Sequence, residues 1–258
     1  MTRLLKRWLA EPLTRGRDIN DPQTTSQRRR IIRGKSFLRS IYAEWYRSVA
    51  EELPPGPEPV LEIGSGAGFM SDYVPALITS EVFLCQKIDL VLNAGRIPFA
   101  DDALRAILMT DVLHHIPDVK RFFTEATRCV RSGGSIIMIE PWVTPWSRQI
   151  YTRLHDEPFE PDAVDWHFAP TGPLSAANGA LPWILFERDR ARFAREFPSW
   201  RIKSIKPMMP FRYLLSGGVS MRALMPGWSF GTWRLVEKLL GPWIDTWAMF
   251  ARIVLVKA

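Results

Sequence analysis

The chain has 258 residues, of which 47% are hydrophobic and 24% charged, so it can bury a core as one large domain or as a domain with an appendage. It has only two cysteines and no uninterrupted apolar stretch of about 18 residues, which argues against a disulfide scaffold and a membrane-spanning helix. The formal net charge of +7 is concentrated in residues 1–50, which carry twelve Lys or Arg and four Asp or Glu. We therefore expect a globular, cytoplasmic protein with a basic N-terminal segment.

Residues 1–26 are predicted to form a basic tail and linker, because residues 10–26 are polar and contain Pro and Gly. Residues 2–10 have the pattern of a short basic amphipathic helix that contacts an anionic membrane surface. A solvated face and a nucleic-acid arm explain the same charge, so charge alone does not decide among the three. Residues 27–53 place apolar side chains three or four positions apart, which predicts one amphipathic helix lying on the domain.

The segment 58–141 alternates between apolar strand-like runs and helical patterns. Four strands are predicted, at 59–64, 77–83, 105–112 and 134–141. A short helix is predicted after the first strand and a longer helix before the last. Continuous apolar strands separated by helices indicate a parallel sheet that is covered on both faces. This is the α/β, Rossmann-like, doubly wound pattern, in which ligands bind beyond the carboxyl ends of the strands.

The composition changes after Pro141, because nine of the eleven tryptophans follow it. Two strand-like runs remain, at 200–207 and 250–258, and a helical pattern at 182–197 precedes the first. We expect them to complete a mostly parallel, seven-stranded sheet, with the Trp-rich pieces inserted on the acceptor side. This organisation makes residues 27–258 a single domain.

The run VLEIGSGAGF at 60–69 ends a strand on Glu62 and then places three glycines at alternate positions. A glycine-rich turn between a strand and a helix lets a ligand approach the backbone. The dinucleotide fingerprint needs a small residue where Phe69 stands, and a carboxylate at position 62 would repel a pyrophosphate. No Gly-Lys-Ser/Thr follows, which excludes a Walker A loop. The glutamate suits a ligand with a cationic end.

With these residues the sequence resembles the class I S-adenosylmethionine (SAM) dependent methyltransferases, of the small-molecule, type 11-like kind. The resemblance covers about 58–141 and continues through LNAGRIPFADD, LMTDVLHHIPD and EATRCVRSGGSIIMIEP in the family's order. It implies a Rossmann-like fold, SAM as the cofactor and methyl transfer as the activity.

The resemblance also implies the cofactor-binding residues: Glu62, Gly64, Ser65, Gly66, Gly68, Glu81, Asn93, Ala94, Thr110 and Asp111. By this analogy Glu62 meets the methionine ammonium and Glu81 accepts from the ribose hydroxyls, with Asp89 as the alternative for the ribose. Asn93 stands where the family often has an aspartate for the adenine amine, and it keeps a carbonyl acceptor. Thr110 and Asp111 would border the methyl group.

Methyl transfer from a sulfonium is an in-line displacement that needs alignment and, for some acceptors, a base. The candidates for a base are His115, with His114 as a weaker alternative, and His155 and His167 in LHDEP and VDWHF. We expect no metal, since no CxxC or HxxxH spacing occurs and two adjacent histidines are expected to point in different directions.

The acceptor pocket is expected in the Trp-rich half, lined by Arg212, Tyr213 and tryptophans that include Trp228. We predict methyl transfer to an oxygen of a small-molecule, sugar or lipid-linked acceptor. Two alternatives remain. One is a SAM-binding protein without turnover that docks on a membrane or a partner, and the other is an RNA methyltransferase that uses the basic N-terminus. Nucleic acid is disfavoured because no [DNS]PP[YF] motif follows the predicted strand at 105–112.

Overall fold

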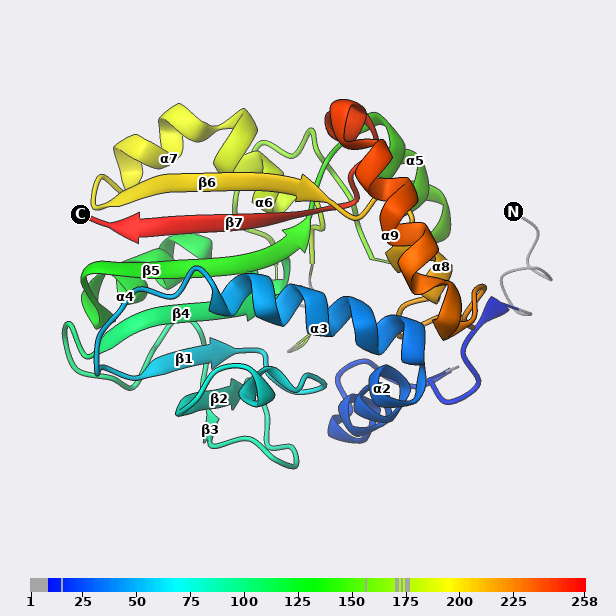
Figure 1. The fold of residues 1–258 in the computed structure, drawn as a ribbon. Coiled ribbons are helices and arrows are strands. Elements are labelled where there is room, and N and C mark those ends of the chain that lie inside the picture. The colour runs from blue at the N-terminus through cyan, green and yellow to red at the C-terminus, as the bar shows by residue number, and fades with distance from the viewer. Residues whose placement is uncertain (1–8, 15, 156, 170–171, 173, 175–176) are drawn as a thin grey trace.

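A computed structural model describes residues 9–258 except 15, 156, 170–171, 173 and 175–176. Its centre is a seven-stranded sheet with the order β3-β2-β1-β4-β5-β7-β6 (Figure 1). The strands are β1 Val60–Ile63, β2 Leu77–Glu81, β3 Leu90–Val91, β4 Leu104–Thr110, β5 Val130–Pro141, β6 Trp200–Met208 and β7 Phe250–Lys257. The pairs among β1 to β5 are parallel, whereas β7 is antiparallel to both β5 and β6. The predicted mostly parallel, Rossmann-like sheet is confirmed.

Helices lie on both sides of this sheet, as the alternating pattern predicts. In Figure 1, α3 runs across the front of the sheet, and α4 and α6 lie behind it. The helices are α2 Pro22–Gly34, α3 Ser36–Ala50, α4 Val119–Cys129, α5 Pro145–Leu154, α6 Leu181–Trp183, α7 Arg190–Glu196, α8 Arg212–Ser216, α9 Phe230–Leu239 and α10 Ile244–Trp247. A π-helical segment, Ile184–Arg188, joins α6 to α7.

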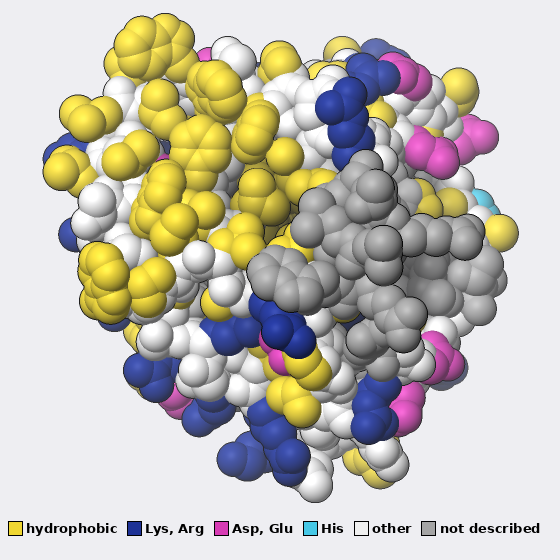
Figure 2. All heavy atoms as spheres, turned by 90° about the vertical axis from the view of Figure 1, so that its right-hand side faces the viewer, with side chains coloured by type: hydrophobic (Ala, Val, Ile, Leu, Met, Phe, Trp, Pro, Cys, Tyr) yellow, Lys and Arg dark blue, Asp and Glu magenta, His cyan; other side chains and the backbone are white. Residues whose placement is uncertain are grey.

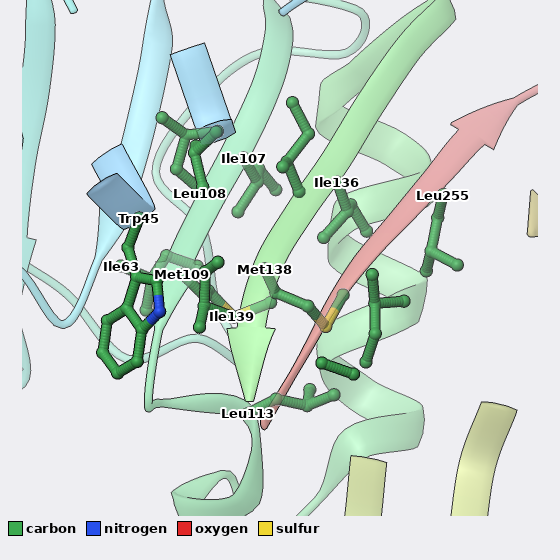
Figure 3. Close-up of a cluster of buried hydrophobic side chains, with 14 of the residues drawn as sticks. Trp45, Ile63, Ile107, Leu108, Met109, Leu113, Ile136, Met138, Ile139 and Leu255 are labelled. Carbon is green, nitrogen blue, oxygen red and sulfur yellow. The ribbon is translucent and has the colours of Figure 1, made fainter. Parts of the chain in front are cut away.

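The core lies where α3 packs on the central strands (Figure 3). Trp45 of α3 lies in the same cluster as Ile63 of β1 and Met109 of β4. Strands β1 and β4 pair with each other at every residue of β1. Both faces of β4 and β5 are buried, which explains their continuous apolar sequences. This packing fixes the carboxyl ends of β1, β4 and β5 side by side.

Two local predictions differ from the structure. The helix expected after β1 is a single 3₁₀ turn, Met70–Asp72, because Pro75 follows closely and Ala76 has φ 54°. The single helix expected at 27–53 is instead two helices, α2 and α3, separated at Lys35. The Lys35 ammonium donates to the carbonyl oxygens of residues 218 and 221, which holds the break in place.

The described part of the expected linker is packed against the C-terminal half. Ala10 forms a bridge with Met221, and the Glu11 amide donates to the Ser220 carbonyl at 2.9 Å. The predicted membrane-contacting helix at 2–10 falls almost wholly outside the described residues. Among the described residues, none of the helices combines the length and apolarity needed to cross a bilayer.

Candidate functional site

The glycine turn after β1 is shaped by close contacts that exclude side chains. Gly64 has φ +73°, and a Cβ there would lie 2.4 Å from a Val112 methyl. A Cβ on Gly66 would lie 2.5 Å from a Glu81 carboxylate oxygen, and one on Gly68 would lie 2.5 Å from the Tyr46 hydroxyl. At these three positions the turn leaves little room for a side chain, which fits a cofactor lying against the backbone.

Glu62 lies at the end of β1, buried beneath this turn. Its backbone carbonyl accepts from the Ser80 hydroxyl at 2.7 Å and from the Ser65 hydroxyl at 3.3 Å. The pKa of the Glu62 carboxyl is raised to about 7, mainly by burial and in part by the nearby Glu81 carboxylate, against the opposing Ser65 hydrogen bond and the charge of Arg29. A buried carboxyl of this kind gains most from a cationic ligand, so the site fits the SAM ammonium.

Glu81 ends β2 at the other side of the turn. One carboxylate oxygen accepts from the Gly66 amide at 3.2 Å and the other from the Val82 amide at 2.9 Å. Asp89, the alternative for the ribose, is exposed and accepts from the amide and hydroxyl of Thr79 at 2.9 and 2.7 Å. Glu81 contacts the glycine turn itself, whereas Asp89 joins β2 to the segment before β3, so Glu81 is the better placed of the two for a ligand held by the turn.

The remaining expected cofactor residues follow β3 and β4. Asn93 is exposed, and its side-chain oxygen accepts from the Gly95 amide at 2.8 Å, with Ala94 partly buried between them. The Thr110 hydroxyl is buried and has no hydrogen-bond partner within the described structure. An orphaned hydroxyl at the end of β4 is a group that a bound ligand can satisfy.

A cavity of about 630 Å³ opens beyond the ends of β4, β5 and β7. Its wall is mostly apolar and comes from α5, from the segment before α6, and from residues 213–221. Arg17, Asp18 and Arg28 from the N-terminal part also line it. The apolar lining includes Ile150, Tyr151, Leu154, Phe159, Tyr213, Leu214, Val219, Met221 and Phe250. Its size is in the range of a pocket for a small organic molecule.

Asp111 stands where the cofactor turn and this cavity meet. It follows β4 directly and lines the cavity, and its neighbour Val112 contacts Gly64 of the glycine turn. Its φ is +62°, a strained conformation for a residue other than glycine, and its amide donates to the Ile139 carbonyl at 2.8 Å. Burial raises the pKa of Asp111 to about 6 against the opposing charge of His114. It is thus ionised near neutral pH and still basic enough to accept a proton.

His114 is held by a buried carboxylate that the sequence motifs do not reveal. Glu140, at the end of β5, accepts from the His114 Nδ1 at 2.7 Å, and its other oxygen accepts from the amides of Val112 and Leu113. Burial by itself would lower the pKa of His114, but the hydrogen bonds to Glu140 and Glu157 raise it well above its usual value. His114 is therefore a fixed cation beneath the cavity.

The Glu157 carboxylate lies close to three histidines of the site. Its carboxylate lies 3.7 Å from His114 Nε2, 3.8 Å from His115 Nε2 and 3.9 Å from His155 Nδ1. Burial would raise the pKa of Glu157, but the hydrogen bond from His114 and the charges of the three histidines hold it below its usual range. Glu157 thus remains a carboxylate that can orient a polar group in the cavity.

The expectation that the two adjacent histidines point in different directions is wrong. His114 and His115 lie in one 3₁₀ turn, and their ring centroids are 4.2 Å apart. With Glu157 they bring three possible metal-ligating atoms within 4.8 Å of one another. Imidazole and carboxylate groups at these separations are of the kind that could hold a metal ion. The same three side chains can also orient a polar group of an acceptor.

The structure separates the predicted acceptor residues into two groups. His115, His155 and Tyr213 line the cavity, as expected. His167 is exposed and pairs with Asp118 in an isolated bridge before α4, so we assign it no role in acceptor binding. Arg212 and Trp228 were also expected to line the acceptor pocket, and neither does. Arg212 is buried in ion pairs with Glu44 and Glu237, and Trp228 is among the most exposed described side chains.

The sheet order and the glycine turn together define a Rossmann-like domain of the class I methyltransferase type. Residues 61–138 match the family described as "Methyltransferase domain". Residues 61–138 are thus identified as a methyltransferase domain, and this match supports SAM as the cofactor of the glycine turn. The glycine turn, Glu62 and Glu81 fit that cofactor: the glycines leave room along the backbone, and the carboxylates suit an ammonium and a diol.

Individual relatives are distant. The demethylmenaquinone methyltransferase of Tropheryma whipplei (strain Twist) is 26% identical over 122 residues, which is 41% of this chain and 50% of that protein. The chain thus matches about half the length of this curated relative. The geranyl diphosphate C-methyltransferase of Streptomyces coelicolor A3(2), solved with Mg²⁺, geranyl diphosphate and S-adenosyl-L-homocysteine, gives a TM-score of 0.53 at 14% identity, covering 97% of this chain and 91% of that one. A geranyl diphosphate methyltransferase solved with SAM gives 0.50 at 13% identity, with 93% of each chain covered. These structures show the fold.

Sequence reasoning missed two carboxylates of the acceptor side, Glu140 and Glu157. Both carry a weak signal, since each precedes a proline at the end of an apolar or aromatic run, in IIMIEP and LHDEP. Neither spacing shows that Glu140 and Glu157, which lie 26 and 43 positions after His114, meet it in space. Arg28 was also missed, because its charge reads as part of a solvated helix face.

Proposed function

We propose that this protein transfers the methyl group of SAM to an ionisable oxygen of a small acceptor with an apolar body. The observation that carries the proposal is the cavity of about 630 Å³, whose apolar walls end at Asp111, His114 and Glu157. A carboxylate and imidazole cluster beside apolar walls suits a hydroxyl on an apolar scaffold. Arg17, Asp18 and Arg28 add charged groups from the N-terminal part of the cavity wall.

In this account the cofactor half of the site places the methyl group beside Asp111. Glu62 would bind the ammonium group of SAM, and SAM would lie along the glycine turn with its methyl group directed towards the cavity. The acceptor hydroxyl gives its proton to the Asp111 carboxylate, its oxygen forms a bond to the methyl carbon, and the carbon–sulfur bond breaks with its electron pair going to sulfur. The products are a methyl ether, S-adenosylhomocysteine and a protonated Asp111.

The histidines and Glu157 have a positioning role. The His114 cation, fixed by Glu140, lies with its Nε2 4.0 Å from an Asp111 oxygen. It stabilises the carboxylate form of Asp111, while Glu157 can accept from the acceptor and orient it. The substrates named for the two relatives, demethylmenaquinone and geranyl diphosphate, are small molecules with apolar parts, which supports an acceptor of this kind.

The proposal is tested by incubating the protein with methyl-labelled SAM and lipid and aqueous fractions of the cells that make it. We expect label in an organic-soluble product, and carbon NMR of that product should show a methoxy group. Label that appears only in aqueous products, or a methyl group bonded to carbon, would contradict the acceptor class or the methylated atom, respectively.

A further inference from the structure

Helix α9, Phe230–Leu239, buries its acidic residue and exposes leucines, which is the reverse of an ordinary surface helix. Its acidic residue, Glu237, faces inward and is only 7% exposed, whereas Leu235 and Leu239 are 59% and 68% exposed. A surface helix of a globular protein normally buries its leucines and exposes its glutamates. The outward leucines therefore need an explanation beyond packing within this chain.

The inward orientation of Glu237 is fixed by strong contacts. Its carboxylate accepts from the Arg212 guanidinium and from the amides of Phe211 and Arg212 at 2.8 and 2.7 Å. The Arg212 guanidinium also lies over the Phe230 ring, 4.8 Å from its centroid, and pairs with Glu44 of α3. Because this network locks the inner side of α9, the helix cannot rotate to bury its leucines.

The apolar surface extends on both sides of α9. We call it the α9 face; it consists of Leu224, Trp228, Leu235, Val236, Leu239 and Trp243, and the two tryptophans are 86% and 60% exposed. These six are the majority of the ten large hydrophobic side chains that are exposed in the described structure, and they fall within 20 residues of sequence. Figure 2 shows apolar side chains gathered over the side of the molecule where α9 lies in Figure 1. A contiguous patch of this kind marks an interaction surface.

The charges around the face select its partner. Among residues 222–245, the exposed cations are Arg222, Arg234 and Lys238, and the exposed acid is Asp245. An apolar centre of Trp and Leu with a cationic rim suits the boundary between headgroups and acyl chains of an anionic bilayer. Tryptophan prefers that boundary because its ring is apolar and its N–H is polar.

We propose that the α9 face docks on an anionic lipid bilayer, with α9 lying along the membrane surface and Trp228 and Trp243 at the headgroup level. A polar protein partner would require hydrogen-bonding groups at the centre of the face, where apolar side chains stand. Docking through this face stands on its own residues and does not depend on the activity of the chain.

Docking also has a consequence for the cavity, and this part rests on the proposed function. Helix α8, which begins at Arg212, is tied to α9 by the Arg212–Glu237 pair, and the amides of Leu224 and Met225 donate to the Leu215 carbonyl. Leu214 and the residues after α8 line the cavity. Helix α8 thus connects the α9 face to one cavity wall, so docking on a bilayer would bring that wall close to an acceptor dissolved in the membrane.

The test is co-sedimentation of the full chain with phosphatidylcholine vesicles, with and without phosphatidylglycerol. We expect binding to the anionic vesicles, and a loss of at least tenfold in the Trp228→Ala/Trp243→Ala double variant. A matched control is Leu84→Ala/Val164→Ala, which removes two exposed apolar side chains away from the face and should leave binding unchanged. Arg234→Glu/Lys238→Glu should weaken binding to anionic vesicles only.

SAM affinity serves as the folding control and should be the same in all these variants. Equal vesicle binding by the tryptophan variant and the unaltered chain would overturn the proposal and assign binding to the basic N-terminal segment. No vesicle binding, together with a dimer that the tryptophan variant dissociates in light scattering, would assign the face to a second copy of the chain. Vesicle binding without any labelled methyl product would instead contradict the proposed function and leave the docking surface intact.

Discussion

The donor and acceptor halves of the site are built in different ways. The donor half is formed by short, continuous segments: Glu62 and three glycines lie within seven residues, and Glu81 ends the adjacent strand. The acceptor half brings together Asp111, Glu140, Glu157 and residues near 214–221, which lie on separate elements. A cofactor shared by a whole family thus has a local motif, whereas a particular acceptor is met by an assembly that only the fold creates.

The strongest test of this division is Asp111→Asn, because asparagine tolerates the positive φ at this position. We expect turnover to fall about 10² to 10⁴-fold, as for loss of a general base, while SAM affinity changes little. His167→Ala is the matched control and should retain full turnover. Equal losses of turnover and SAM affinity in Asp111→Asn would instead assign Asp111 to the donor half alone.

The next largest effect is expected for Glu62→Gln on the donor half. Hydrogen bonds to charged groups contribute about 1.5–3 kcal/mol, so SAM affinity should fall roughly 10 to 150-fold in calorimetry. Asp89→Asn is the control, because the Asp89 carboxylate joins β2 to its neighbour away from the turn. A larger loss of SAM affinity in Asp89→Asn than in Glu81→Gln would identify Asp89 as the ribose ligand instead of Glu81.

Gly64→Ala tests the shape of the glycine turn. The positive φ and the Val112 methyl at 2.4 Å from a new Cβ should destabilise the fold by about 1–3 kcal/mol in urea unfolding. Gly231→Ala is the comparison, since a Cβ there meets nothing within 4 Å. It should be neutral or slightly stabilising, because alanine favours a helix. Equal stabilities of the two variants would show that the turn is not restricted to glycine.

The smallest predicted effect is a difference in pH dependence between SAM affinity, set by the donor half, and turnover, set by the acceptor half. Glu62 has a pKa raised to about 7, so its carboxylate is lost as pH falls through 7, and SAM affinity should decline between pH 7.5 and 6. Asp111 has a pKa raised to about 6, so turnover at saturating SAM should hold until lower pH and then fall. Glu62→Gln should remove the first dependence and Asp111→Asn the second. A single shared midpoint would contradict two separately titrating halves.

The sheet could be predicted, and a donor site proposed, because the signals of both are local. The strands of residues 60–141 are continuous apolar runs, and Glu62 sits at the boundary of the glycine turn. The break at Lys35 could not be predicted, since it depends on carbonyls more than 180 residues away. Glu157 and Glu140 were likewise hidden, because the sequence separation of contacting side chains carries no pattern. The outward leucines of α9 have a helical period, but the period does not tell which face is buried.

The most direct test of the central claim is a calorimetric titration of the intact chain with SAM at pH 7.5, beside the Glu62→Gln variant. We expect one SAM per chain, with affinity reduced roughly 10 to 150-fold in the variant. No heat and no thermal stabilisation with SAM, or equal affinity in the variant, would contradict a SAM site built on Glu62 and the glycine turn.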